Sequence, residues 1–224
     1  MKRALFFTLV ATSLSGLAYA QGAKRGTAEA AIQGKRVTVD YGRAELRGRS
    51  LDSLIAQLPD DRVWRAGVDD VTTLTTEGDL SVDGLSGSSC SRNRRPGGGR
   101  KVPAGRYSVY VSAPQEGDWL LILNSDPGIE LGVLAKAMGF SVPESAAKRL
   151  WPHLEGYNLN RSRHVSGIAD REVARVTMRP GVADPPVDPF TVSLQPAGSN
   201  ALTLTLAWAD KTWSIDLNGP AYFP

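Results

Sequence analysis

Residues 201–217 read ALTLTLAWADKTWSIDL. Apolar side chains fill every second position from Leu202 to Trp208 and again from Trp213 to Leu217. Alternation with a period of two is typical of β-strands that have one buried face and one wet face. Because Trp208 and Trp213 flank the short segment Ala-Asp-Lys-Thr, we expect two strands joined as a hairpin.

The same alternation recurs along the rest of the chain. Seven further segments show it, at 36–41, 71–76, 79–82, 106–112, 118–124, 173–179 and 189–195. About nine short strands with turn signals between them predict a mainly β fold, an antiparallel β-sandwich or barrel-like domain.

Two segments follow a helical pattern instead. Residues 50–58 (SLDSLIAQL) place apolar side chains at helical spacing behind Ser50, which predicts one short helix with a serine N-cap. Residues 129–168 are predicted to be a helical insertion, in which residues 141–144 (SVPE) resemble a capping box and apolar positions continue to Leu154.

The first 20 residues have the layout of a secretory signal. Lys2 and Arg3 precede an apolar run over residues 4–17, and the small-x-small sequence of residues 18–20 follows. The run is too short for a helix to cross a hydrocarbon core of roughly 30 Å. We therefore predict export, with cleavage at Ala20-Gln21 and a periplasmic or extracellular location without a transmembrane anchor.

The remainder is predicted to be a polar N-terminal segment (21–34) and a single β domain (35–218). This domain carries the helical insertion and a Gly-, Ser- and Arg-rich loop insertion at 86–101. The chain holds 26 Lys and Arg against 23 acids, and two of these bases lie in the signal, so the processed chain has a net charge of +1. This balance argues against a nucleic-acid partner. The single cysteine, Cys90, excludes an intramolecular disulfide, so stability must come from the core.

Three stretches together resemble a known family. They are Lys35 to Arg49 (KRVTVDYGRAELRGR), Val63 to Leu74 (VWRAGVDDVTTL) and Val102 to Val109 (VPAGRYSV), followed by residues 119–124 (WLLILN). They resemble the bacterial domain of unknown function family 2911, over roughly residues 33–125 and more weakly over 171–217. The resemblance implies a secreted, all-β domain without an assigned activity.

The family's usual central motif reads Trp-Arg-x-Gly-Ala-Asn-Glu-Ala-Thr. Trp64, Arg65, Gly67 and Thr72 fit this motif, whereas residues 68–71 (VDDV) replace its Ala-Asn-Glu-Ala core. Position 70 therefore keeps an acid, Asp, whose side chain is one carbon shorter than that of the motif's Glu. At position 69 the motif's Asn is replaced by Asp, so its amide is lost. The loop insertion and the helical insertion are additions to the compact form of the family.

The most densely charged residues outside the predicted loops lie in two of these stretches: Tyr41, Arg43, Trp64, Arg65, Asp69 and Asp70. Acids and guanidinium groups beside an aromatic ring could line a small polar cleft that holds a sugar or another polar ligand by charge-assisted hydrogen bonds. The alternative is structural: Arg43 or Arg65 ties down the loop that carries the two acids as an ion pair with backbone contacts.

Other chemistry has less support in the sequence. The chain has no G-x-S-x-G elbow, no H-E-x-x-H and no paired cysteines, so we expect no catalytic nucleophile, metal or cofactor. The basic cluster at 92–101 is interpreted as a solvated loop, and Trp119, Trp208 and Trp213 as core residues rather than a sugar-stacking platform.

We predict a non-catalytic binding module outside the cytoplasm for a carbohydrate-like or other polar ligand. Its partner would be a cell-envelope glycan or protein. Two alternatives remain open: an acid/base hydrolase that uses Asp69 or Asp70, which would need two carboxyl groups about 5 to 9.5 Å apart, and a structural or assembly component that docks through the helical insertion.

Overall fold

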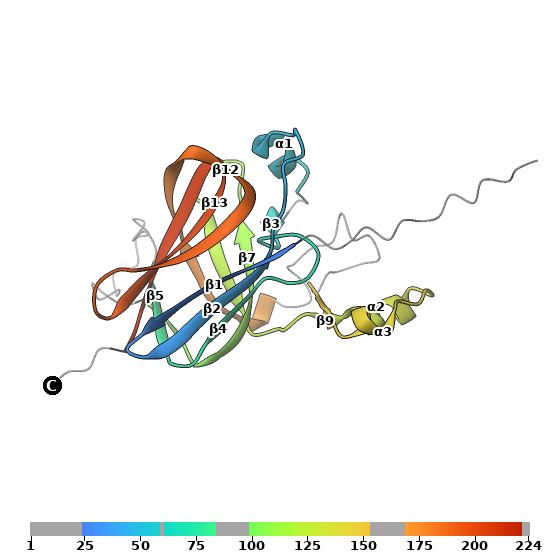
Figure 1. Ribbon diagram of the computed structural model, residues 1–224, viewed down its shortest axis with the longest axis horizontal. Helices are drawn as coiled ribbons and strands as arrows, with labels where there is room; N and C mark the ends of the chain where they lie inside the picture. The colour runs from blue at the N-terminus through green and yellow to red at the C-terminus, as the bar shows by residue number, and fades with distance from the viewer. Residues whose placement is uncertain (1–23, 59–60, 84–98, 153–168, 221–224) are drawn as a thin grey trace, which may run out of the picture.

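The protein is a sandwich of two antiparallel sheets with a small arm at one end (Figure 1). The computed structural model describes residues 24–58, 61–83, 99–152 and 169–220. The predicted signal, most of the loop insertion and residues 153–168 of the helical insertion lie outside the described residues. The mainly β, antiparallel sandwich is confirmed, and the sheets are not closed into a barrel.

The larger sheet has seven strands. Its order is β1-β2-β4-β7-β8-β11, and β3 also pairs with β7. The strands span Arg25–Ile32 (β1), Lys35–Gly42 (β2), Val63–Trp64 (β3), Thr73–Thr76 (β4), Gly105–Ser112 (β7), Leu120–Asn124 (β8) and Glu172–Thr177 (β11). A 3-10 turn, η1 (Ala169–Arg171), precedes β11.

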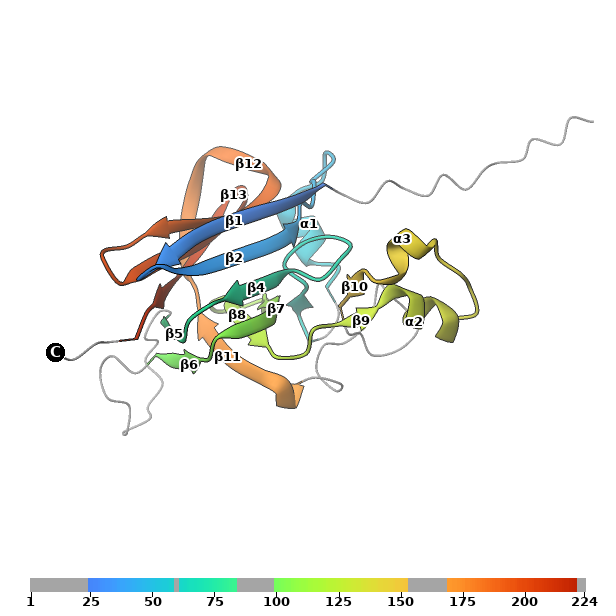
Figure 2. The same cartoon turned by 60° about the horizontal axis from the view of Figure 1, so that its bottom comes forward.

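The smaller sheet has four strands in the order β12-β13-β5-β6. They span Arg179–Pro196 (β12), Ala201–Asn218 (β13), Leu80–Asp83 (β5) and Arg100–Val102 (β6). The two sheets lie close at both edges, because β1 contacts β12 and β11 contacts β6, as Figure 2 shows.

The core lies between the sheets and follows the period-two alternation. Leu202, Leu204 and Leu206 of the smaller sheet are each at most 2% exposed, as are Val39 and Leu74 of the larger one. The prediction of one wet face fails at β7 and β8, where Tyr110 and Ile122 are also buried and form a second, small cluster with Val63.

The C-terminal hairpin prediction is wrong. Residues 201–218 form one continuous strand, β13, which pairs with β12 along most of its length. Even-numbered residues are buried up to Trp208 and odd-numbered ones from Trp213 onwards. Ala209 adopts a left-handed φ of 55°, and the register with β12 shifts beside it. A β-bulge accounts for this change of face without reversing the chain.

Strand β1 was not predicted because the apolar pattern of its sequence, RGTAEAAI, is weak. In the structure only Ala28 and Ile32 of this strand are buried. It pairs with β2 along its whole length through a tight turn at Gln33 and Gly34, whose φ angles are 51° and 75°. Two consecutive positive φ angles are typical of the two-residue turns that join antiparallel strands. The sheet therefore begins at Arg25, inside the polar segment that was predicted to precede the domain.

The predicted short helix is confirmed as α1 (Leu51–Ile55), and the Ser50 side chain accepts a hydrogen bond from the backbone N–H of Ser53. The predicted capping box is wrong. The N-cap of α3 (Glu144–Ala147) is Pro143, and no side chain caps this helix. The helical pattern up to Leu154 is also interrupted, because Leu150–Trp151 form strand β10.

The helical insertion forms the arm. Its described part consists of α2 (Leu131–Ala137) and α3, which are joined to the sandwich by the two-stranded sheet of β9 (Ile129–Glu130) and β10. Both views show the arm projecting from one end of the sandwich (Figures 1 and 2). No helix in the described part of the chain combines the length and apolar character needed to span a membrane.

Candidate functional site

Two loops pack tightly against each other at the end of the sandwich that carries the arm. Strand β2 ends at Gly42, where an added Cβ would collide with the carbonyl of Val68. At Gly67 a Cβ would lie 2.8 Å from Thr72 Oγ1 and 2.9 Å from the Gly42 carbonyl oxygen. Thr72 Oγ1 donates a hydrogen bond of 2.8 Å to the Ala66 carbonyl. Gly42, Gly67 and Thr72, which lie in two of the family-like stretches, therefore shape the loop junction.

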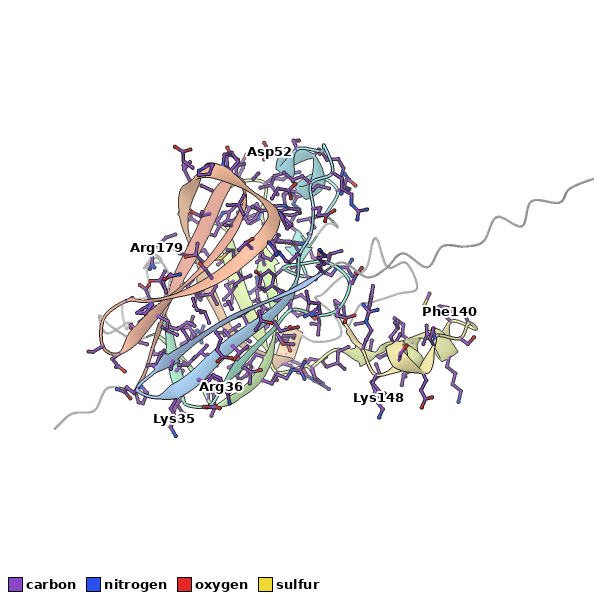
Figure 3. The ribbon with its side chains drawn as sticks, in the orientation of Figure 1. Lys35, Arg36, Asp52, Phe140, Lys148 and Arg179 are labelled. Atoms are coloured by element: carbon purple, nitrogen blue, oxygen red, sulfur yellow. The ribbon has the colours of Figure 1, made fainter. Side chains whose placement is uncertain are left out.

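A groove with a cavity volume of about 880 Å³ lies beside this junction. One side is formed by residues 43–49 and by the apolar face of α1 and the turn after it. Residues 64–69 and Trp208 contribute further lining, and the arm forms the opposite side through residues 131–151. Figure 3 shows Phe140, which lines the groove, near the outer end of the arm, whereas Lys35 and Arg36 lie at the other end of the sandwich.

Three of the six predicted site residues line this groove: Arg43, Trp64 and Asp69. The Trp64 ring stacks on Trp208, with centroids 5.2 Å apart and an interplanar angle of 17°. Asp69 adopts a left-handed φ of 61°, a conformation that Asn and Asp tolerate better than most residues. Asp69 can therefore adopt this backbone conformation with little strain.

The other three predicted residues have different surroundings. Tyr41 is only 4% exposed and packs edge-on against Phe190 in the core, with ring centroids 5.7 Å apart. The guanidinium of Arg65 lies over the Trp151 ring, 5.2 Å from its centroid. Burial lowers the pKa of Arg65, and the nearby Asp69 carboxylate opposes this shift.

Asp70 is bound by the arm rather than by either predicted arginine. Arg149 Nη2 lies 2.7 Å from Asp70 Oδ1, and Arg149 Nε donates to both carboxylate oxygens. The hydrogen bond to Asp70 raises the pKa of Arg149. Asp70 is therefore an attachment point for the arm.

Several residues of the groove were not predicted. Arg149 and Trp151 belong to the arm, and nothing in the sequence links them to a loop almost 80 positions earlier. Lys24 lies in an exposed segment without a motif, whereas Arg49 ends the family-like stretch of residues 35–49 but was not singled out. The apolar positions of α1 could have been found, since Leu54, Ile55 and Leu58 formed the predicted apolar face of that helix.

The tryptophans form two separate stacks. Trp208 stacks on Trp64 at the groove, whereas Trp119 stacks on Trp213 with centroids 4.1 Å apart and an interplanar angle of 5°. The second stack lines a smaller cavity of about 250 Å³. Trp208 and Trp213 are 4% and 5% exposed, as expected for core residues.

The fold and the site define a β-sandwich protein whose grooved end is assembled from two interlocking loops and an inserted arm. The family model described as "Protein of unknown function (DUF2911)" matches residues 23–87. This match confirms the resemblance over the segment that carries β1, β2, α1 and the loop junction. It does not extend to the arm or to strands β12 and β13. No curated protein and no solved structure matched the chain.

Proposed function

We propose that this protein is an exported binding module that holds a carbohydrate-like or other polar ligand in the groove. The observation that carries the proposal is the lining of the groove, where the half-buried rings of Trp64 and Trp151 lie among charged side chains. Flat aromatic surfaces combined with a few charged hydrogen-bonding groups suit a polar ligand that also has apolar ring faces. The cavity volume of about 880 Å³ is within the range of small-ligand sites.

The loop that carries Arg43 to Arg49 is held in place by hydrogen bonds from both sides. The Arg43 N–H donates to the Lys24 carbonyl at 3.0 Å, and the Phe190 N–H donates to the Ala44 carbonyl at 2.8 Å. The Leu46 N–H donates to Asp188 Oδ1 at 3.1 Å. A preformed loop supports binding because less conformational entropy is lost when a ligand is held.

A groove-filling substitution tests this proposal. Ala146 lines the groove, and we expect Ala146→Trp to fill part of it and to weaken binding at least tenfold, the equivalent of about 1.4 kcal/mol. Ala137→Trp is the matched control, because Ala137 is exposed on α2 and does not line the groove. Tryptophan fluorescence and thermal shift of the processed protein would be measured against a panel of neutral and acidic cell-envelope oligosaccharides. Absence of any response from the wild type, or unchanged binding by Ala146→Trp, would contradict the proposal.

Export is part of the proposal and has its own test. The charged start, the apolar run and the small-x-small sequence of the first 20 residues support cleavage after Ala20. The expected result is a product in the periplasmic or culture fraction whose N-terminal sequence begins at Gln21. A full-length product retained in the cytoplasm would contradict it.

A second candidate function is docking of a protein partner on the arm. It is favoured by the exposure of two apolar side chains there, Val133 at 55% and Phe140 at 45%. A photo-crosslinking residue at position 133 is expected to give a discrete adduct in intact cells, whereas the same residue at position 35, at the other end of the sandwich (Figure 3), is not. Equal labelling from both positions would count against docking.

A further inference from the structure

The groove has an excess of positive charge. Among the lining residues that the structure describes, five are basic: Lys24, Arg43, Arg47, Arg49 and Arg149. Two of the described lining residues, Glu45 and Asp69, are acidic. This local excess contrasts with the net charge of +1 for the processed chain, so it is a property of the groove and not of the whole protein.

Two of the five basic side chains are paired with carboxylates. Arg149 binds Asp70, and Arg47 Nε lies 3.2 Å from a carboxylate oxygen of Glu45. Lys24, Arg43 and Arg49 form no ion pair with any residue that the structure describes. Three cations of the groove therefore form no ion pair within the described ranges, although the Arg49 side chain donates hydrogen bonds to the Leu46 and Glu45 carbonyls.

Some residues that line the groove also carry buried hydrogen-bond donors. Arg43 Nε, Trp151 Nε1 and Trp208 Nε1 are buried and have no hydrogen-bond partner within the described ranges. All three residues line the groove, and all three atoms are donors. Basic side chains without an ion-pair partner are complementary to a ligand with negatively charged acceptors.

From these observations we infer that the ligand is an acidic saccharide, whose carboxylate or phosphate group lies against Lys24, Arg43 and Arg49. The half-buried rings of Trp64 and Trp151 provide apolar contact for a sugar ring. Arginine suits this role because its planar guanidinium can bind either anion through two hydrogen bonds. The inference rests on the proposed function, since it names the class of ligand for the same groove.

Matched pairs of probes isolate the negative charge. Tetragalacturonate would be compared with its fully methyl-esterified form, which keeps the sugar rings and loses the charges. Glucose 6-phosphate would be compared with glucose, so that a phosphate source is distinguished from a carboxylate source. We expect at least one acidic probe to bind the processed protein about tenfold or more tightly than its neutral counterpart in isothermal titration calorimetry. Its affinity should fall as the ionic strength rises, because salt screens exposed charges.

Charge-removing variants assign the effect to the groove. Arg43→Gln and Arg49→Gln should each weaken binding of the acidic probe about tenfold, the size expected for loss of a charge-assisted contact. Arg43→Lys keeps the charge and should recover most of the affinity. Arg106→Gln is the control, because Arg106 is exposed on β7 and does not line the groove; it should leave the affinity unchanged. The melting temperature of each variant shows whether it remains folded.

The outcomes separate this inference from the proposed function. Equal affinity for the acidic and the neutral member of both pairs, or unchanged affinity in both Arg→Gln variants, overturns the acidic-saccharide inference alone. Binding of a neutral oligosaccharide that Ala146→Trp abolishes, with no binding of either acidic probe, also overturns that inference and leaves the proposed function standing. If no saccharide binds at all, both are overturned.

Discussion

Arg149 of the arm holds both carboxylate oxygens of Asp70, with Nε 2.8 Å and 2.9 Å from Oδ1 and Oδ2 and Nη2 2.7 Å from Oδ1. The pair joins the inserted arm to the loop after β3. A backbone hydrogen bond also joins the arm to this loop, because the Val71 N–H donates to the Leu150 carbonyl at 2.9 Å. One wall of the groove therefore depends on a contact between segments that are remote in the sequence.

Breaking this ion pair is expected to loosen the arm more than it destabilises the sandwich. The Asp70 side chain is 16% exposed and that of Arg149 is 36% exposed. The pair is therefore partly buried, and its contribution to stability should lie between those of a buried and a surface ion pair. We expect Asp70→Asn and Arg149→Met each to lower the free energy of unfolding by about 1–2 kcal/mol. Proteolysis within residues 131–151 should become faster in both variants.

A double-mutant cycle would check that the two residues act through each other. The double variant should lose less free energy of unfolding than the two single variants together, because the second substitution removes a residue that has already lost its partner. Arg36 and Glu77 form a more exposed pair, with side chains 59% and 45% exposed, and provide the control cycle. Additive effects at Asp70 and Arg149 would show that the pair does not attach the arm.

The loop junction gives a prediction about backbone packing. Gly42→Ala would force a methyl group into the backbone carbonyl of Val68. Neither segment can move away easily, because Gly42 is fixed by the sheet and Val68 by the loop. We expect a loss of about 3 kcal/mol or more in the free energy of unfolding, or failure to fold. Gly34→Ala is the control, because Gly34 has a positive φ of 75° and open space around its Cα. That variant should cost only about 1 kcal/mol from backbone strain. Similar losses in chemical denaturation would contradict the close approach.

Features that depend on local sequence patterns can be predicted from this sequence. Features that depend on contacts between remote segments of the chain cannot. The alternation of β13 predicts which side chains are buried, but a shift of the alternation from even to odd positions fits a hairpin and a bulged strand equally well. Only the pairing with β12 decides between them, and that pairing is tertiary. The contact between Asp70 and Arg149 is equally invisible to local patterns. By contrast, Arg43 and Trp64 were found because they lie in charge-rich stretches that resemble a known family.

The stack of Trp208 on Trp64 leads to a prediction about a single atom. Trp208 Nε1 is buried without a hydrogen-bond partner among the described residues, so loss of this N–H removes no bond there. Trp208→Phe should therefore cost less than half as much free energy of unfolding as Trp208→Ala, for which about 3–5 kcal/mol is expected from the cavity left behind. Equal losses for the two variants in urea denaturation would mean that the indole N–H is bonded in solution.

Acid should destabilise the protein partly through Glu77. The Arg36 backbone N–H donates to Glu77 Oε2 at 3.0 Å, and this bond, with those from the Arg36 side chain, lowers the pKa of the Glu77 carboxyl. Because the folded-state pKa is below the unfolded value of about 4.3, ionised Glu77 favours folding above that pH. The contribution is lost as the pH falls through the folded-state pKa. The melting temperature of Glu77→Gln should thus fall less between pH 6 and pH 3 than that of the wild type. Glu116→Gln, at an exposed position, should follow the wild type.

Because of the bulge in β13, two Ala→Gly substitutions in this strand should have opposite effects on the free energy of unfolding. Ala209 has a φ of 55°, which costs an alanine about 1 kcal/mol and a glycine almost nothing. Ala209→Gly should therefore raise the free energy of unfolding by about 0.5–1 kcal/mol. Two residues earlier, Ala207 pairs with Thr191 in regular strand geometry, and Ala207→Gly should lower it by about the same amount through loss of backbone entropy. Because both residues are half-buried alanines in one strand, the comparison isolates the backbone conformation. Destabilisation by both variants in chemical denaturation would mean that Ala209 lies in ordinary strand geometry, and the change of buried face along β13 would then need another cause.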